Sequence, residues 1–112
     1  MTGTRRPIEF CGASLSALRS FPADARRVAG FQLDRVQRGR NPLDWKPLPS
    51  LGAGVREIRV RERSGSFRVV YLAGVKKTVV VLHCFRKTTR RTSRLDLEIA
   101  RSRYRGLMRN QQ

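Results

Sequence analysis

Acidic residues are scarce in this 112-residue chain, in which 25 lysines and arginines stand against 8 aspartates and glutamates. The resulting formal net charge of +17 makes the folded chain repel itself, and a polyanion relieves that repulsion. Nucleic acid is therefore the leading partner, because neutralising several phosphates releases counterions and gains affinity. An anionic membrane surface is the second candidate that this charge allows.

Cysteine and histidine are also rare, and their scarcity argues against both a disulfide framework and a metal site. The two cysteines, Cys11 and Cys84, lie in apolar segments with no CxxC or Cys/His spacing, and His83 is the only histidine. We therefore expect both thiols to be small buried side chains in a reducing compartment.

No apolar run approaches the ~20 residues that span a bilayer, and the first residues, MTGTRRPIEF, lack the apolar centre of a signal peptide. These features predict a cytoplasmic protein with no membrane partner. The hydrophobic share of 39% still allows a packed core, so the chain is expected to form a single domain over residues 7–107 with a loose tail over 108–112.

The N-terminal half predicts a short strand at 7–11, a small helix at 14–19 capped by Ser14, and a longer helix from Pro22 to Gly39. The apolar stripe of the longer helix consists of Ala25, Val28, Ala29, Leu33 and Val36. Residues 41–54 contain three prolines and two glycines and predict a loop. Trp45, Leu48 and Leu51 are expected to attach this loop to the core.

Three strands are predicted at 55–63, 66–73 and 78–85, separated by turns at 64–65 and 74–77, as in an antiparallel meander. The last strand is apolar at both parities, with Val79, Val81, His83 and Phe85 on one side and Val80, Leu82 and Cys84 on the other. Such a strand lies centrally and is covered on both faces. A final helix begins near Ser93, which forms a capping box with Asp96, and its predicted packing stripe is Leu95, Ile99, Ala100 and Leu107.

The positive charge is concentrated in residues 56–94, which carry twelve cations and two acids. Arg59 and Arg61 alternate with the apolar residues of their strand, so they are expected on an open face of the sheet or, alternatively, on a charged edge strand. Arg68 stands in the middle of an apolar strand and must find an anion. It either holds a phosphate, which we favour, or pairs with Glu57 across the hairpin.

The succession PIEFCG, FPADARR, NPLDWKPLPSLGAGVREIRVR, FRVVY and VLHCFRKTTRRT resembles the phage-derived toxin-like branch of the RelE/HigB superfamily, the toxins of type II toxin–antitoxin modules. The likeness covers nearly all of residues 7–107. It implies an α+β, RelE-like fold in which helices flank an antiparallel sheet. It also implies an endoribonuclease that cleaves mRNA on the ribosome, and a small helix-turn-helix antitoxin as partner.

The resemblance also suggests site residues. Arg59 and Arg61 match basic positions on the family's second strand, Arg68 matches an arginine on the third, and Lys87 matches the basic residue after the fourth. The catalytic candidates are Lys87, Arg68 and His83, and the RNA-binding candidates are Arg59, Arg61, Arg86, Arg90 and Arg91. Cleavage through the RNA 2′-hydroxyl needs a base, an acid and phosphate-binding cations, but no metal is obligatory, so no cofactor is expected.

The sequence offers three possible proton carriers, Lys87, His83 and Glu57. Arg86, Arg90 and Arg91 are expected to lower the pKa of Lys87 and so to suit it to acid or base chemistry. Histidine exchanges protons readily near neutral pH, but a lone histidine in an apolar strand is more often a hydrogen-bonded core residue. Glu57 is a second possible base, although a salt bridge is the preferred interpretation.

Two other functions remain compatible with the sequence. The same superfamily includes ParE-like inhibitors of DNA gyrase, and a phage remnant can retain nucleic-acid binding after losing catalysis. The basic face and Lys87 favour the nuclease, whereas the lack of an evident proton carrier favours the inhibitor. Phe67 and Tyr71 alternate with Arg68 and either stack on RNA bases or, as we favour, fill the core.

Overall fold

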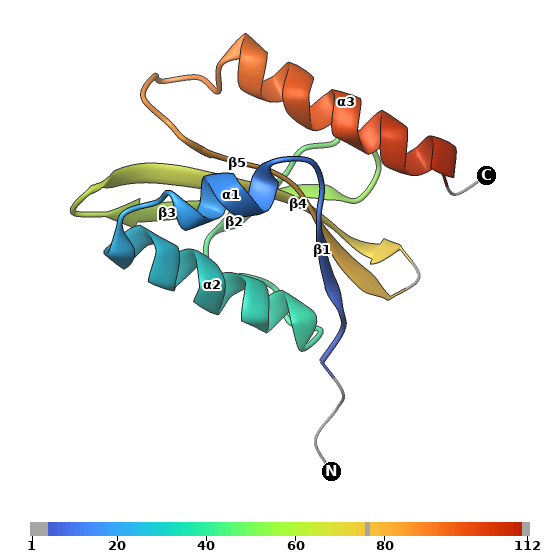
Figure 1. Ribbon diagram of the computed structural model, residues 1–112, viewed down its shortest axis with the longest axis horizontal. Helices are drawn as coiled ribbons and strands as arrows, with labels where there is room; N and C mark the ends of the chain where they lie inside the picture. The colour runs from blue at the N-terminus through green and yellow to red at the C-terminus, as the bar shows by residue number, and fades with distance from the viewer. Residues whose placement is uncertain (1–4, 76, 111–112) are drawn as a thin grey trace.

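The computed structural model describes residues 5–75 and 77–110, which form three helices and a five-stranded sheet (Figure 1). The elements are β1 (Ile8–Phe10), α1 (Ser14–Arg19), α2 (Ala23–Gln37), β2 (Trp45–Pro47), β3 (Val55–Glu62), β4 (Gly65–Val75), β5 (Thr78–Arg86) and α3 (Arg94–Asn110). The strand order is β1-β5-β4-β3-β2. Of the described strand pairs, β1–β5 is parallel and the other three are antiparallel, so the predicted meander of β3, β4 and β5 forms the centre of the sheet.

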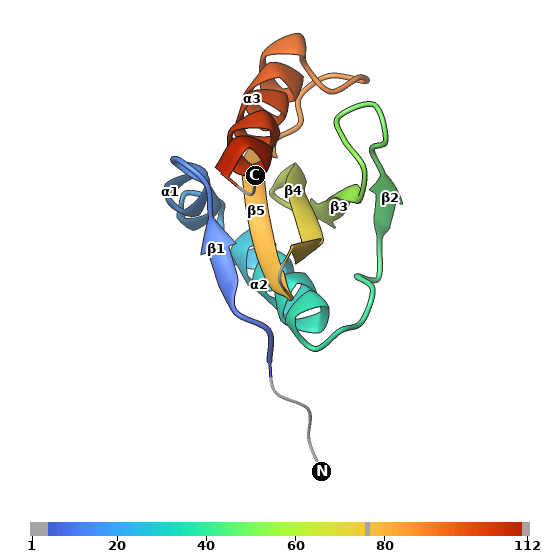
Figure 2. The same ribbon diagram turned by 90° about the vertical axis from the view of Figure 1, so that its right-hand side faces the viewer.

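Helices cover both faces of the sheet, with α1 and α2 on one side and α3 on the other (Figure 2). The side chains of β5 divide between the two hydrophobic clusters: Val79, Val81 and Cys84 pack toward α1 and α2, and Val80, Leu82 and Phe85 pack toward α3. This arrangement confirms the predicted α+β fold and the central position of β5. It also means that the face carrying Arg59 and Arg61 is not fully open, because α3 covers its apolar part.

The first two helices follow the sequence closely. Helix α2 begins after Pro22, and its predicted stripe faces the core. It ends before Gly39, whose φ of 81° lies in the left-handed region that favours glycine. Ser14, in contrast, caps nothing: it is buried and its hydroxyl donates to the carbonyl of Val81 at 3.3 Å.

The loop predicted over residues 41–54 contains the short edge strand β2, which pairs antiparallel with β3. The three prolines of this segment led to the prediction of a loop. Pro47 is tolerated in β2 because one side of an edge strand forms no hydrogen bonds with a neighbouring strand. Leu51 is buried and Leu48 packs against the α3 cluster, as expected. Trp45 is only half-buried, and its ring lies 4.2 Å from the guanidinium carbon of Arg56.

A β-bulge in β5 changes the predicted alternation. Val81 pairs with Tyr71 and His83 pairs with Val70, so Leu82 is an extra residue on this strand. Leu82 and His83 therefore both face α3. The prediction that His83 and Phe85 share a face with Val81 is wrong, since the bulge shifts the alternation after Val81 by one residue.

Helix α3 starts where predicted, and the Ser93 hydroxyl oxygen accepts the backbone N–H of Asp96 at 3.1 Å. Its packing stripe differs: Leu95 is 66% exposed, and the helix packs through Leu97, Ala100, Tyr104, Leu107 and Met108. The helix continues to Asn110, so residues 108–110 are helical rather than a loose tail. The predicted tail residues 111–112, and residue 76 of the second predicted turn, lie outside the described residues.

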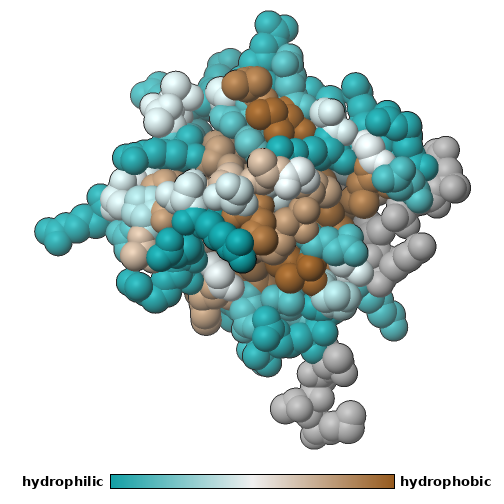
Figure 3. Space-filling model, viewed as in Figure 1, coloured by the Kyte–Doolittle hydropathy of each residue, from teal (hydrophilic) through white to brown (hydrophobic). Residues whose placement is uncertain are grey.

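Figure 3 shows hydrophilic side chains surrounding a central apolar area on the face toward the viewer. Within residues 5–75 and 77–110, no helix combines the length and the apolar character needed to cross a membrane.

The two cysteines differ in their burial. Cys84 is buried, which raises the pKa of its thiol to about 12. Cys11 is half-buried rather than buried as expected.

Candidate nucleic-acid interface

Side chains of β3, β4 and β5, most of them polar, form three rows on the face that α3 partly covers. The pairing places Glu57, Val70 and His83 in one row, Arg59, Arg68 and Phe85 in the next, and Arg61, Ser66 and Lys87 at the rim. Lys46 of β2 extends the first row beside Glu57. We call the group of Lys46, Glu57, Arg59, Arg61, Arg68 and Lys87 the cationic face. Neighbouring strands lie about 4.8 Å apart, so the side chains of one row are close enough together to contact the same phosphodiester segment.

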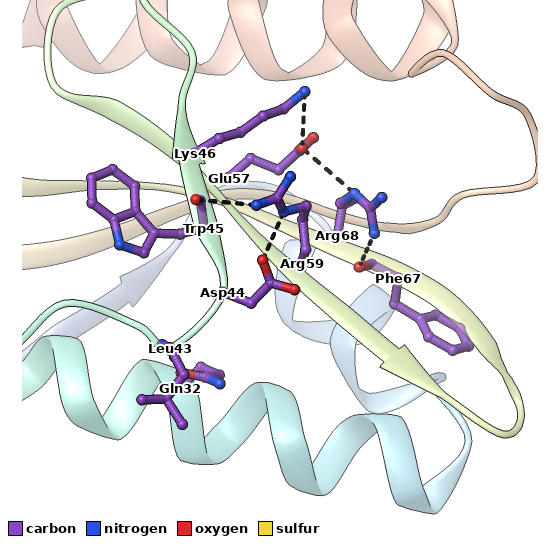
Figure 4. A network of polar contacts seen from close by, with 9 residues as sticks. All are labelled: Gln32, Leu43, Asp44, Trp45, Lys46, Glu57, Arg59, Phe67 and Arg68. Atoms are coloured by element: carbon purple, nitrogen blue, oxygen red, sulfur yellow. Dashed lines mark hydrogen bonds and ion pairs between the residues drawn. The ribbon is translucent and has the colours of Figure 1, made fainter.

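Glu57 lies at the buried centre of the cationic face (Figure 4). The residue is 0% exposed, and its Oε1 lies 3.5 Å from Arg68 Nε and 3.8 Å from Lys46 Nζ. Neither carboxylate oxygen accepts a hydrogen bond from the described residues. The carboxylate is thus held by charge alone, between one buried and one exposed cation.

Arg68 is 5% exposed and is therefore not displayed on an open face, as the sequence suggested. Its Nη1 donates to the carbonyl of Phe67 at 3.0 Å, and its Nε faces Glu57. Burial lowers the pKa of the Arg68 guanidinium, while Glu57 acts in the opposite direction. The pair with Glu57, the less favoured of the two sequence interpretations, is present in the structure. Phe67 and Tyr71, which alternate with Arg68, are buried core residues, as favoured.

Arg59 and Arg61 differ in whether their charge is already paired within the protein. Arg59 Nε lies 2.9 Å from Asp44 Oδ1, and Arg59 Nη2 donates to the carbonyl of Trp45 at 3.5 Å. Arg61 is exposed, and it makes no ion pair within the part of the chain that the structure describes. Arg61 is accordingly the arginine of the cationic face whose charge is most available to a ligand.

Lys87 follows β5 directly and is fixed by its backbone, whose N–H donates to the carbonyl of Ser66 at 2.8 Å. Desolvation lowers the pKa of the Lys87 ammonium, and Arg68, Lys46 and Arg59 lower it further, whereas Glu57 raises it. The direction agrees with the sequence prediction, but the neighbouring cations are different from those predicted.

Arg86, one of the cations predicted to lie beside Lys87, points to the opposite face of the sheet. It pairs with Phe67, its Nη2 donates to the carbonyl of Ser64 at 2.9 Å, and its guanidinium carbon lies 5.5 Å from the Phe67 ring centroid. Arg90 and Arg91 are exposed in the loop before α3. The structure therefore brings Arg59, Arg61, Arg68 and Lys87 together but leaves Arg86 on the other face.

His83 connects the sheet to α3. Its ring is stacked on Phe85 at a centroid distance of 5.0 Å, and its Nε2 lies 2.7 Å from Asp96 Oδ1. The other carboxylate oxygen of Asp96 accepts the hydroxyl of Ser93 at 2.6 Å. His83 is 7% exposed, and its Nδ1 has no hydrogen-bond partner among the described residues.

Arg103, two turns further along α3, donates from Nη1 to the carbonyl of the bulged Leu82 at 2.8 Å. Together with the His83–Asp96 contact, this bond fixes α3 to adjacent residues of β5. These two polar contacts, together with the apolar packing of α3, fix how the helix lies across this face of the sheet.

Lys46 and the ion-pairing role of Asp44 were not predicted, because the prolines around β2 obscure its alternation. Asp96 was predicted only as part of a capping box and not as the partner of His83. No short-range pattern joins residues 83 and 96, since their contact depends on the bulge. Among the described residues, no group of three or more His, Cys, Asp or Glu side chains is placed to hold a metal ion.

Two solved structures share this arrangement of helices and strands. A double arginine-to-alanine mutant of the E. coli toxin RelE in the free state is 14% identical, with a TM-score of 0.58 over 93% of this chain and 99% of that chain. RelBE2, a toxin–antitoxin complex from Mycobacterium tuberculosis, gives 24% identity and a TM-score of 0.52 over 75% of this chain and 100% of that chain. The fold is therefore RelE-like, as the resemblance implied.

The sequence itself identifies the family. Residues 16–105 match the family model described as Phage derived protein Gp49-like (DUF891), and the chain belongs to this family. Comparison with the curated proteins finds no match. The family assignment agrees with the phage-derived branch to which the sequence was compared.

Proposed function

We propose that this protein is the toxin of a type II toxin–antitoxin module and acts as a ribosome-dependent mRNA endonuclease in the cytoplasm. The observation that carries the proposal is the cationic face, in which the exposed Arg61 and the partly exposed Lys87 border the buried Arg68. The Gp49-like family and the RelE-like fold support the toxin role. One of the similar structures is a toxin–antitoxin complex, which supports an antitoxin, expected to be a small helix-turn-helix protein, as partner.

The proposed reaction is attack of an RNA 2′-hydroxyl on the adjacent phosphate, with departure of the 5′-oxygen. Arg61 binds the phosphate at the rim, and Arg68, deeper in the face, stabilises the negative charge that gathers during attack. Guanidinium groups release a proton with difficulty and are therefore poor proton carriers. Lys87 is the side chain of the face suited to move a proton, since its pKa is lowered and its chain is accessible.

Glu57 and His83 have supporting roles in this proposal. The buried Glu57 carboxylate orients Arg68 and Lys46 and is withdrawn from the surface where RNA binds. His83, which the sequence offered as a catalytic candidate, positions α3 through Asp96. The ribosome supplies the orientation of the message, which lets a site with few proton carriers remain effective.

The test is to induce the protein in bacteria and to map RNA 5′ ends on translated messages. Wild type is expected to produce cuts at defined positions within codons and to arrest growth. Lys87→Ala is the sharpest variant because the side chain is partly exposed and its loss leaves the core intact. It is expected to abolish the cuts while antitoxin binding persists.

A matched control is Arg27→Ala, which removes one exposed cation from α2 on the other side of the sheet. Full cutting by Lys87→Ala would refute the site assignment. Growth arrest without cuts, accompanied by gyrase-dependent DNA breaks, would replace the nuclease with a ParE-like inhibitor. RNA binding without toxicity or cuts would instead indicate a non-catalytic remnant.

A further inference from the structure

A second cationic hollow lies on the opposite face of the sheet and at the other end of β3 and β4. It has a volume of about 280 Å³ and is lined by Arg6, Val36, Gly39, Arg40, Asn41, Gly54, Arg56, Ala73 and Gly74. Three of these residues are arginines from three separate segments, and none is acidic. The cationic face contains none of these residues, so the hollow is a separate feature.

The hollow is built by backbone features that keep it empty of side chains. Gly39, Gly54 and Gly74 all have positive φ, at 81°, 80° and 101°, and a Cβ at Gly74 would meet nothing within 4 Å. The backbone of Arg6 is fixed because its N–H donates to the carbonyl of Gln37 at 2.8 Å and its carbonyl accepts Gln37 Nε2 at 2.8 Å.

Arg56 is also held in place. Its Nη1 donates to Asn41 Oδ1 at 2.9 Å, and its guanidinium stacks on the Trp45 ring. The residue directly opposite Arg56 on β4 is the fully buried Tyr71; burial raises the pKa of its phenol, and the nearby Arg56 guanidinium acts in the opposite direction. A guanidinium held in place in this way keeps further N–H donors for an oxyanion in the hollow.

The edge strand β2 links this hollow to the cationic face. Alternate residues of a strand point to opposite faces, so Lys46 faces Glu57 while Trp45 faces the other side with Arg56. Figure 4 shows the Trp45 ring extending away from the side chains of Lys46 and Glu57. A half-exposed aromatic ring beside arginines is typical of single-stranded nucleic-acid binding, where bases stack and guanidiniums hold phosphates.

We propose that the hollow binds a phosphate group of single-stranded RNA whose chain passes around the β2 edge from the cationic face, with a base against Trp45. This inference shares with the proposed function only the choice of RNA as ligand. The two are separable because binding is measured on RNA carrying 2′-O-methyl groups, which lacks the nucleophile and is not cut.

Trp45 is the only tryptophan of the chain, so its fluorescence reports directly on this edge. The protein is titrated with a 2′-O-methyl RNA of about ten nucleotides. Parallel titrations use inorganic phosphate, a nucleoside monophosphate and an acidic peptide. The RNA is expected to change the Trp45 emission at far lower concentration than phosphate or the mononucleotide.

The test variant is Arg6→Gln with Arg40→Gln, which spares Arg56 and so preserves the stacking on Trp45. The control is Arg19→Gln with Arg27→Gln, which removes the same charge from exposed positions outside the hollow. If both substituted arginines contact phosphates, the slope of log affinity against log salt concentration is expected to decrease by about 1.4 relative to wild type. The control is expected to leave the slope near that of wild type.

Equal affinity and equal slope for the two double variants would overturn the proposal. It would also be overturned if the acidic peptide, and not RNA, changed the Trp45 emission, or if free phosphate did so as strongly as RNA. Loss of RNA cleavage in Lys87→Ala with unchanged Trp45 titration would leave the hollow supported. Binding at the hollow without any cleavage by wild type would refute the proposed function alone.

Discussion

The buried pair of Glu57 and Arg68 makes a quantitative prediction about stability. Arg68→Met leaves the fully buried Glu57 carboxylate with Lys46, at 3.8 Å, as its remaining ion-pair partner. Removing one partner of a buried ion pair costs about 3–5 kcal/mol. For a domain of this size such a loss corresponds to a decrease in Tm of about 12–20 °C.

The double variant Glu57→Leu with Arg68→Met is expected to recover most of that loss. It removes both charges, keeps the net charge at +17, and fills the space with apolar side chains. Replacing a whole buried ion pair by apolar residues is often close to neutral. The coupling free energy between the two positions is therefore expected to be about 3 kcal/mol or more.

The assay is urea unfolding of wild type, both single variants and the double variant, followed by far-UV circular dichroism. Equal m-values are required for the comparison of the free energies of unfolding. Additive effects of the two substitutions would refute the reasoning, as would a cost below about 1 kcal/mol for Arg68→Met. If the double variant is stable but does not cut RNA, it also separates the role of Arg68 in cleavage from its role in folding.

Three further predictions concern other positions. Lys87→Arg keeps the positive charge but cannot titrate, so it is expected to abolish cleavage while RNA binding persists; retained cleavage would exclude Lys87 as the proton carrier. Lys46→Gln removes a cation that lowers the pKa of Lys87, and the pKa of Lys87 is therefore expected to rise. The rising limb of the pH–rate profile should then move to higher pH, and a limb that moves to lower pH would contradict this. Gly52→Ala places a Cβ 2.3 Å from the Tyr104 ring and is expected to cost about 1–3 kcal/mol in urea unfolding. The matched control is Gly30→Ala, at an exposed helix position where the added Cβ has no atom within 4 Å. There the free energy of unfolding is expected to rise by up to about 1 kcal/mol. A comparable loss of stability in both variants would argue against the close contact between residue 52 and Tyr104.

The elements that the sequence predicted well are those with a strong local pattern. Helix α2 has a continuous stripe, a proline at its start and a glycine after its end, and the three long strands are separated by turn residues. Local patterns were enough for these elements because each one buries side chains at its own period. The capping of α3 by Ser93 was likewise predictable from two residues three positions apart.

Features that depend on tertiary pairing were not predictable in this way. The run Val79 to Leu82 is apolar at every position, so nothing local shows which residue is extra, and the bulge decided the face of His83. Leu95 continues a plausible helical stripe, but the contacts of α3 with β5 rotate it toward solvent. The charge count located the cationic region, yet which arginines are buried or paired depended on β2, which prolines concealed.

Two polar contacts lie at the ends of the loop before α3 and have a consequence for variation of the chain. One end of the loop before α3 is fixed where Lys87 bonds to Ser66, and the other where Asp96 meets His83. Residues 88–92 between these anchors can change in length and sequence at little cost to the fold, because closing a slightly longer loop adds little entropy. Arg90 and Arg91 lie in this segment. This loop can therefore be altered while the residues of the cationic face keep their positions.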